Sequence, residues 1–129
     1  MTHTVLITDD NELIRETLEK ALVSEGYRVR LAKDGRECLE AARPGDIDLI
    51  LLDMRLPDIN GLEVLQRLRQ DPSDPIVLMM TAFGDVESTK KALELGAFDF
   101  IRKPVTPKAL ASIIKMAMEI RSLRQEIQQ

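Results

Sequence analysis

The stretch Leu49-Ile50-Leu51-Leu52-Asp53 places four large aliphatic residues in a row and ends them with one carboxylate. An apolar run without polar alternation predicts a β-strand that is covered on both faces, as in a parallel sheet. Two further runs of this kind lie at residues 5–7 and 76–80, and weaker ones lie at 29–32 and 98–102. The sequence therefore predicts five strands, of which the third ends at Asp53.

Segments with helical periodicity separate and follow these runs. Their ends carry the residue types that favour helix caps and stops: Asp or Asn three residues before Glu at two N-termini, and Gly after two C-termini. These residues are Asp34, Glu37, Asn60, Glu63, Gly26 and Gly96, with Asp85 as a further expected cap. Thr106 followed by Pro107 predicts the start of a last helix. Strand and helix thus alternate five times, which predicts a three-layer α/β sandwich.

Composition excludes several classes of protein. A chain of 129 residues with 44% hydrophobic residues is expected to form one globular domain rather than a disordered segment. Its single cysteine, Cys38, excludes an internal disulfide and favours a reducing, cytoplasmic compartment. No apolar run approaches the roughly 18 residues of a membrane span. A net charge of −4 and 3% aromatic residues argue against direct binding of nucleic acid.

Polar residues follow four of the five expected strands. Asp9 and Asp10 follow the first, Asp53 ends the third, Thr81 follows the fourth and Lys103 follows the fifth. Because parallel sheets bind ligands at the carboxyl ends of their strands, we expect these side chains to converge. Three neighbouring carboxylates repel one another unless a cation offsets their charge, and Mg²⁺ prefers oxygen ligands. The sequence therefore predicts a magnesium site beside a carboxylate that can act as a nucleophile toward phosphorus.

Each of these residues has an ordinary role when it is taken alone. An aspartate at a strand end commonly caps a helix, and a lone lysine is commonly solvated. The hypothesis of a site therefore depends on all of them meeting at one edge of one sheet.

The motifs that carry these residues resemble the receiver domain of two-component response regulators. They are Thr8-Asp9-Asp10, Leu52-Asp53-Met54-Arg55-Leu56-Pro57-Asp58, Gly61, Thr81-Ala82 and Lys103-Pro104. The resemblance covers about residues 4–122. It implies a flavodoxin-like fold with a five-stranded parallel sheet in the order 2-1-3-4-5.

The resemblance also implies a role for each acidic residue. Asp53 is the expected phosphoacceptor, and the expected donor is a phosphohistidine on a sensor histidine kinase. Asp10, Asp53 and the backbone carbonyl of Arg55 are the expected Mg²⁺ ligands, with Asp9 acting through a coordinated water. Arg55 and Phe83 are expected to adjust the lifetime of the phosphoryl group, the first by screening it and the second by crowding the attacking water. The chain is then a signalling domain that supports its own phosphorylation and slow dephosphorylation, not an enzyme with a separate substrate.

A switch follows from the same resemblance. Thr81 and Lys103 are expected to hold the phosphoryl oxygens, and the peptide bond between Lys103 and Pro104 is expected to be cis. When Thr81 moves toward the phosphoryl group, it leaves space that the ring of Phe100 can enter. The fourth helix is weakly apolar, so we expect it to move at low cost when this switch operates.

The last helix carries two apolar seams. Leu110, Ile114 and Ala117 are spaced to pack on the sheet. A second seam follows the a/d spacing of a coiled coil, and it consists of Ala109, Ile113, Met116, Ile120, Leu123 and Ile127. This outer seam predicts a homodimer, with a receiver domain at residues 1–122 and a last helix, residues 107–129, that continues into a coiled-coil linker to an effector. The alternative is one broad core face with a frayed tail.

Two stretches resemble the receivers of NtrC-type regulators most. They are Thr81-Ala82-Phe83-Gly84-Asp85-Val86 and Gly96-Ala97-Phe98-Asp99-Phe100-Ile101. In that sub-family the receiver controls the assembly of an ATPase that acts with an alternative sigma factor. The resemblance therefore implies control of transcription.

Two other classes of protein fit the sequence less well. A phosphatase or phosphotransferase of the haloacid dehalogenase kind needs a second acid two residues after its nucleophile, and this chain has Arg55 there. A flavin or nucleotide binder of similar fold needs a loop rich in Gly, Ser or Thr after the first strand. This chain has Asp9-Asp10-Asn11-Glu12, which would repel phosphate where no metal intervenes.

Overall fold

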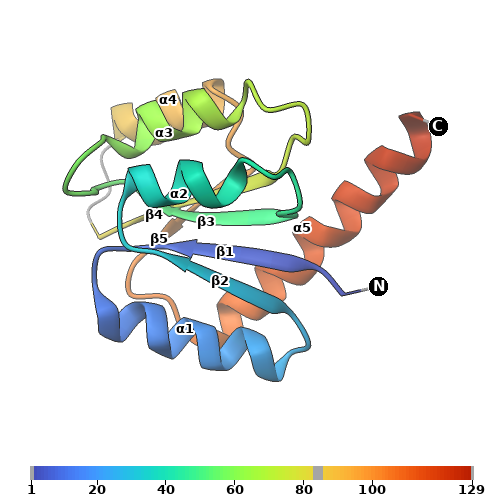
Figure 1. Cartoon of the computed structure of the whole chain (residues 1–129), viewed down its shortest axis with the longest axis horizontal. Coiled ribbons are helices and arrows are strands. Elements are labelled where there is room, and N and C mark those ends of the chain that lie inside the picture. The colour runs from blue at the N-terminus through green and yellow to red at the C-terminus, as the bar shows by residue number, and fades with distance from the viewer. Residues whose placement is uncertain (1, 83–85, 129) are drawn as a thin grey trace.

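The computed structural model describes residues 2–82 and 86–128. Within these residues five strands and five helices alternate along the chain, and all neighbouring strands are parallel (Figure 1). The order of the strands, β2-β1-β3-β4-β5, confirms the predicted fold. The elements are β1 (Thr4–Thr8), α1 (Glu12–Ser24), β2 (Arg28–Ala32), α2 (Gly35–Ala42), β3 (Leu49–Asp53), α3 (Gly61–Leu68), β4 (Ile76–Thr81), α4 (Val86–Glu94), β5 (Asp99–Arg102) and α5 (Pro107–Gln128).

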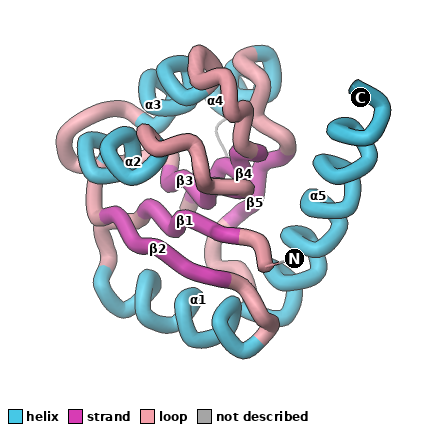
Figure 2. The backbone as a smooth tube through the Cα atoms, turned by 45° about the vertical axis from the view of Figure 1, so that its right-hand side comes forward, coloured by secondary structure: helices cyan, strands magenta, loops and turns pink. Residues whose placement is uncertain are grey.

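Helices cover both faces of the sheet, so the molecule has three layers. Figure 2 shows α1 and α5 on one face and α2, α3 and α4 on the other, and each group of helices shares a separate apolar core with the sheet. Every residue of β1, β3 and β4 is buried, whereas the edge strands β2 and β5 are partly exposed. This difference explains why unbroken apolar runs marked the three inner strands and weaker patterns marked the two edges.

The capping box predicted at α2 forms only in part. Asp34 caps the helix, since its carboxylate accepts a hydrogen bond from the N–H of Glu37 at 2.8 Å. In a complete capping box the side chain of Glu37 would bond back to the N–H of Asp34. It accepts instead from the N–H of Lys33, at 2.9 Å, one residue before the cap.

The capping box predicted at α3 also lacks its second half. Asn60 caps the helix by accepting from the N–H of Leu62 at 2.8 Å. Glu63 forms an ion pair with Arg67, one turn along the helix, at 3.1 Å. An exposed glutamate with a guanidinium four residues away favours that charge over the backbone amide of the cap. The expected cap of α4, Asp85, lies outside the described residues.

The inner seam of α5 packs as predicted. The helix begins at Pro107, and the Oγ1 atom of Thr106 accepts from the N–H of Ala109 at 3.1 Å. Leu110, Ile114 and Ala117 are fully buried against the sheet and α1. Met118 is also buried, which the predicted pattern omitted.

The outer seam of α5 is largely uncovered. Its exposed fractions are 50% for Met116, 57% for Leu123 and 84% for Ile127. Ala109 is exposed as well, while Ile113 and Ile120 are half-buried. Figure 1 shows the last turns of α5 running past the edge of the sheet. Even so, no helix in the described part of the chain combines the length and apolar composition that crossing a membrane requires.

Arg121 marks the point at which α5 leaves the sheet. Its guanidinium donates to the carboxylate of Asp48 at 2.8 Å and to the carbonyl of Ser73 at 3.2 Å. Asp48, just before β3, also accepts from the N–H of Thr4 at the start of β1, at 2.8 Å. These bonds tie α5 to the amino-terminal edge of the sheet, opposite the edge that carries Asp53.

Gly61, the first residue of α3, lies against the main chain at the end of β3. A Cβ atom there would lie 2.7 Å from the carbonyl oxygens of both Asp53 and Met54. We predict that Gly61→Ala lowers the free energy of unfolding by about 3 kcal/mol or more, because these main-chain atoms cannot move aside as a flexible side chain could. Urea unfolding measures the difference.

Gly26→Ala is the control for this variant. Gly26 has a φ of +95° but open space around it, so an alanine there meets only backbone strain, of about 1–2 kcal/mol. Equal losses for the two variants would contradict the crowding at Gly61.

Candidate functional site

The carboxyl ends of four strands bring the five candidate residues to one edge of the sheet. Asp9 and Asp10 follow β1, Asp53 ends β3, Thr81 ends β4 and Lys103 follows β5. β1 and β4 both pair with β3, and β5 pairs with β4, so these ends are neighbours. Asp9, Asp53 and Thr81 are buried, Lys103 is half-buried and Asp10 is exposed. The site therefore has two buried carboxylates, those of Asp9 and Asp53, and one exposed carboxylate, that of Asp10.

The three carboxylates lie close enough to share one cation. One oxygen each of Asp9, Asp10 and Asp53 falls within 4.8 Å of the others. The donors are all carboxylate oxygens, two buried and one facing solvent, which suits a hard cation that keeps some of its waters. Among the described residues, the side chain of Asp10 makes no hydrogen bond or ion pair, so its oxygens are available to a metal. The residues present thus fit Mg²⁺.

The ammonium group of Lys103 lies between two of these carboxylates. Its Nζ donates to Oδ2 of Asp9 at 2.5 Å and to Oδ2 of Asp53 at 2.9 Å. Burial alone would lower the pKa of Lys103, but the two carboxylates outweigh burial and raise it, so the side chain is charged at neutral pH. Burial raises the pKa of Asp53, while the bonds from Lys103 and from the N–H of Arg55 act in the opposite direction. Lys103 is the internal cation that lets two buried carboxylates coexist.

The main chain around Asp53 holds its carboxylate at the rim. Oδ1 of Asp53 accepts from the N–H of Arg55 at 3.1 Å. The N–H of Met54 donates to the carbonyl of Met80 at 2.8 Å, and the carbonyl of Met54 accepts from the N–H of Gly61 at 3.0 Å. Residues 54–61 therefore form a closed loop over the site, and Arg55 lies on its exposed side.

Thr81 and Phe100 point to the same face of the sheet. Met79 lies in the core beneath α2, α3 and α4, and Thr81 is two residues further along β4. Phe100 pairs with Met79 across β4 and β5, is half-buried, and packs against that core. Within Val86–Glu94, only Ala92 is buried, so α4 covers this face lightly.

The end of β5 is tied to the end of β4. The N–H of Lys103 donates to the carbonyl of Thr81 at 2.7 Å, which keeps these two side chains on the same rim. The peptide bond between Lys103 and Pro104 is cis, as the resemblance implied. Phe83, the expected second lifetime residue, lies outside the described residues.

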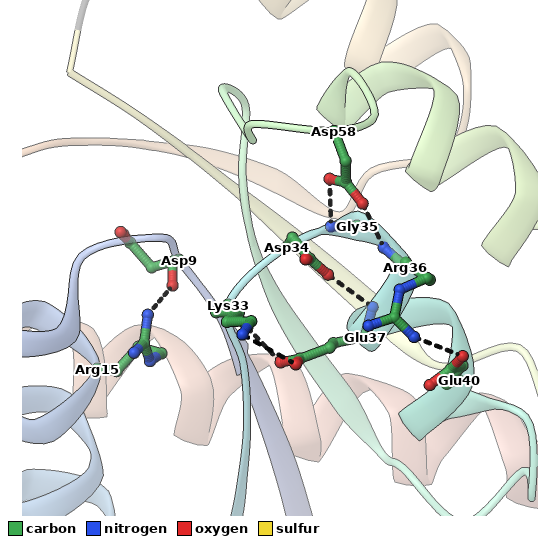
Figure 3. A network of polar contacts seen from close by, with 9 residues as sticks. All are labelled: Asp9, Arg15, Lys33, Asp34, Gly35, Arg36, Glu37, Glu40 and Asp58. Atoms are coloured by element: carbon green, nitrogen blue, oxygen red, sulfur yellow. Dashed lines mark hydrogen bonds and ion pairs between the residues drawn. The ribbon is translucent and has the colours of Figure 1, made fainter.

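Sequence analysis missed two contacts around this site, and Figure 3 shows both. The guanidinium of Arg15, on α1, donates to the carbonyl of Asp9 at 2.7 Å. Asp58, on the loop after β3, points to the N-terminus of α2 and accepts from the N–H groups of Gly35 and Arg36, each at 2.9 Å. Desolvation acts to raise the pKa of Asp58, but these backbone bonds outweigh it and lower the pKa. Asp58 ends the motif from Leu52 that carries the family resemblance, but nothing in the sequence indicates its contact with α2.

Comparison with known proteins decides the family. The model of the response regulator receiver domain matches residues 5–115. The chain belongs to this family. Regulatory protein AtoC of Escherichia coli (strain K12) is 32% identical over 123 residues, which are 95% of this chain and 27% of AtoC. Transcriptional regulatory protein CusR of the same strain is 41% identical over 100 residues, which are 78% of this chain and 44% of CusR.

Solved structures agree with this assignment. A CheY-like response regulator receiver domain protein from Methanospirillum hungatei JF-1 has a TM-score of 0.92 and 29% identity, covering 96% of this chain and 99% of that one. NtrX from Brucella abortus has a TM-score of 0.91 and 29% identity, covering 99% of this chain and 29% of that one. The chain is thus a receiver domain of two-component response regulators, and it spans half or less of the curated relatives it matches.

The contacts of Lys103 generate a stability prediction for this receiver domain. Lys103→Met leaves the buried carboxylates of Asp9 and Asp53 without their shared cation. We expect the free energy of unfolding at pH 7 to fall by about 2 kcal/mol or more. Added Mg²⁺ should restore part of the loss, since it replaces the missing positive charge. Urea unfolding with and without Mg²⁺ measures both effects.

Lys33→Met is the matched control. Lys33 is 63% exposed and lies 3.9 Å from Glu37, so its loss should cost about 0.5 kcal/mol or less and should not respond to Mg²⁺. The account of Lys103 is wrong if the two variants behave alike.

Proposed function

We propose that this receiver domain takes a phosphoryl group onto Asp53 from a phosphohistidine of a sensor histidine kinase and thereby changes a surface that controls transcription. The observation that carries the proposal is the position of the Asp53 carboxylate. It lies at the end of a buried strand, 2.9 Å from the Lys103 ammonium and within 4.8 Å of two further carboxylates. A carboxylate held among these charges, with a loop of backbone amides beside it, suits transfer of phosphate to an oxygen nucleophile.

The transfer balances as a simple displacement. One carboxylate oxygen of Asp53 forms a bond to phosphorus, the bond from phosphorus to the histidine nitrogen breaks, and its electron pair stays on the imidazole. Lys103 turns from Asp53 toward a phosphoryl oxygen and keeps its bond to Asp9, which fixes where that oxygen lies. Mg²⁺, when bound, neutralises charge on the phosphoryl oxygens. Asp10, Asp53 and the carbonyl of Arg55 would hold it directly, with Asp9 acting through a water.

A groove beside the site supports the proposal that a partner kinase binds there. An apolar groove of about 510 Å³ runs between α1 and the loop from β5 to α5, next to Lys103. Leu13, which is 71% exposed, and Pro104 line it. A helix that carries the phosphohistidine can cover this groove while its imidazole reaches Asp53. Arg55, on the exposed side of the loop, would then screen the phosphoryl group after the kinase leaves, and Phe83 would crowd the attacking water.

The switch is supported by the shared face of Thr81 and Phe100. A phosphoryl oxygen on Asp53 offers the Thr81 hydroxyl a new acceptor, and movement of Thr81 opens space toward the Phe100 ring. The light packing of α4 lets this surface rearrange at low cost. Phosphorylation of Asp53 would therefore change the positions of α4, β5 and the neighbouring part of α5.

The output is proposed to pass through a homodimer. The outer seam of α5 exposes large apolar side chains that a second copy would cover in a short parallel coiled coil. In this arrangement residues 1–122 form the receiver and residues 107–129 continue as a linker toward an effector domain. Similarity to AtoC and NtrX supports an NtrC-type regulator of transcription, acting in the cytoplasm, in which the receiver itself does not contact nucleic acid.

Phosphorylation at Asp53 can be tested with a small donor. We predict that acetyl phosphate and Mg²⁺ add one phosphoryl group to the wild-type chain, giving an adduct that is relatively stable in acid and labile in base. Asp53→Asn should give no adduct, because an amide oxygen is a poor nucleophile. Intact mass spectrometry measures the yield. The control, Asp46→Asn, removes an exposed carboxylate paired with Arg30 and should leave the adduct unchanged. An adduct that persists in Asp53→Asn rules out Asp53 as the acceptor.

The homodimer can be tested through the outer seam. We predict that Leu123→Glu raises the dissociation constant of the dimer by at least about tenfold, because it puts an unpaired charge into the apolar contact. Ser122→Glu adds the same charge beside the seam and should change the constant little. Analytical ultracentrifugation with and without beryllofluoride, a phosphoryl mimic, gives both constants. A wild-type monomer in both states would contradict the dimer.

A further inference from the structure

We infer that Asp58 is a positioning residue for the phosphoacceptor site: its carboxylate fastens the loop that carries Arg55 to the N-terminus of α2. The inference rests on the proposed function, since it concerns the loop whose Arg55 carbonyl would face Mg²⁺. Asp58 itself is exposed and touches none of the reacting groups. Its effect on the site would pass through the main chain of the loop.

The contact of Asp58 is a two-oxygen clamp between distant parts of the chain. Oδ1 accepts from the N–H of Gly35 and Oδ2 from the N–H of Arg36, both at 2.9 Å, across 23 and 22 residues of sequence. These are the first two residues of α2, where backbone N–H groups have no partner within the helix and the helix dipole favours negative charge. The clamp therefore uses strong, charge-assisted bonds of fixed direction.

α2 does not depend on Asp58 for its own cap. Asp34 already accepts from the N–H of Glu37, and the Glu37 side chain bonds to the N–H of Lys33. α2 also packs into the core through Cys38 and Ala42, both buried. The helix is thus the fixed partner, and the loop is the element that the clamp holds.

The approach of the loop to α2 requires Gly35. A Cβ atom on Gly35 would lie 2.9 Å from Val64, 3.1 Å from Ile59 and 3.3 Å from Oδ1 of Asp58. The loop therefore lies directly on the main chain of α2, and the side chains of Ile59 and Val64, which both follow Asp58 in the sequence, make the contact tight. This closeness is what lets a short aspartate side chain reach two amide groups at once.

The clamp closes a loop whose two ends are already fixed. At one end the N–H of Met54 bonds to Met80, and at the other the N–H of Gly61 bonds to the Met54 carbonyl. Between these ends Leu56 and Ile59 are half-buried and pack against the core, while Arg55 and Pro57 are exposed. Asp58 supplies a polar anchor at this outer part of the loop, three residues from Arg55. The direction of the Arg55 carbonyl then depends on both the strand end at Asp53 and the clamp at Asp58.

Two variants separate this role from ordinary helix capping. Asp58→Ala removes the clamp, and Asp34→Ala removes a carboxylate cap from the same helix without touching the loop. We expect Asp58→Ala to weaken Mg²⁺ binding about tenfold, as loss of an outer-sphere support does, and Asp34→Ala to weaken it less than about twofold. Asp58→Asn keeps one acceptor oxygen, so it should fall between Asp58→Ala and wild type.

The measurement is a titration of each folded protein with Mg²⁺ alone, followed by the NMR signals of the backbone amides of residues 53–56 and 58. Urea unfolding of the same variants shows how far each one loses stability. The expected pattern is a loss of stability in both alanine variants and a loss of Mg²⁺ affinity only when Asp58 is changed. Hydrogen exchange should also speed up at the amides of Gly35 and Arg36 in Asp58→Ala.

Three outcomes would overturn the inference. Unchanged Mg²⁺ affinity in Asp58→Ala removes the positioning role, and equal weakening in both alanine variants assigns the effect to α2 as a whole. In either case the wild-type chain still binds Mg²⁺ and accepts phosphate from acetyl phosphate, so the proposed function stands. If the wild-type chain does neither, the proposed function fails and the positioning role fails with it.

Discussion

The structure depends on the pairing of one ammonium group with two buried carboxylates at the carboxyl edge of a parallel sheet. Strand ends of a parallel sheet meet on one side, so the residues that follow them cannot be kept apart. In this chain three of those residues are acidic, and their repulsion would oppose folding. Lys103 offsets it by bonding to Asp9 and Asp53 together, 94 and 50 residues away in sequence. The site therefore sets three carboxylates against one ammonium group, an excess of negative charge that a divalent cation such as Mg²⁺ can balance.

The groups at the amino-terminal ends of the strands differ in kind from those at the carboxyl-terminal ends. At the amino-terminal edge, Arg121, Asp48 and Thr4 join α5 to β1 and β3 through bonds that fix the helix in place. At the carboxyl edge Asp10 is exposed and Lys103 is half-buried. Packing is light along α4 and β5, where a signal from Asp53 is proposed to pass. The exposed turns of α5 begin just beyond Arg121, so this anchor sets the direction in which they leave the sheet.

Carboxylates serve three separate purposes around this site. Asp9, Asp10 and Asp53 form the acidic cluster, Asp34 caps a helix, and Asp58 fastens a loop to that same helix. The roles differ because the partners differ: a metal or ammonium, one local amide, or two amides of a distant segment. The role of a carboxylate therefore cannot be read from its residue type alone and depends on its bonding partners. The loop between Asp53 and Gly61 illustrates this, since its shape depends on contacts with β4, α2 and α3 as well as on its own residues.

The strands, their parallel arrangement and the edge at which Asp9, Asp10, Asp53, Thr81 and Lys103 meet could all be predicted from the order of residues along the chain. Burial on both faces leaves an unbroken apolar pattern, and parallel strands leave their last residues on one side, so local composition was enough. The bonds of Lys103 to two carboxylates, the clamp of Asp58 on α2 and the anchor of Arg121 on Asp48 were decided only by the tertiary structure. Each joins segments 22 to 94 residues apart. Each depends on how close two backbones approach, which no pattern of neighbouring residues encodes.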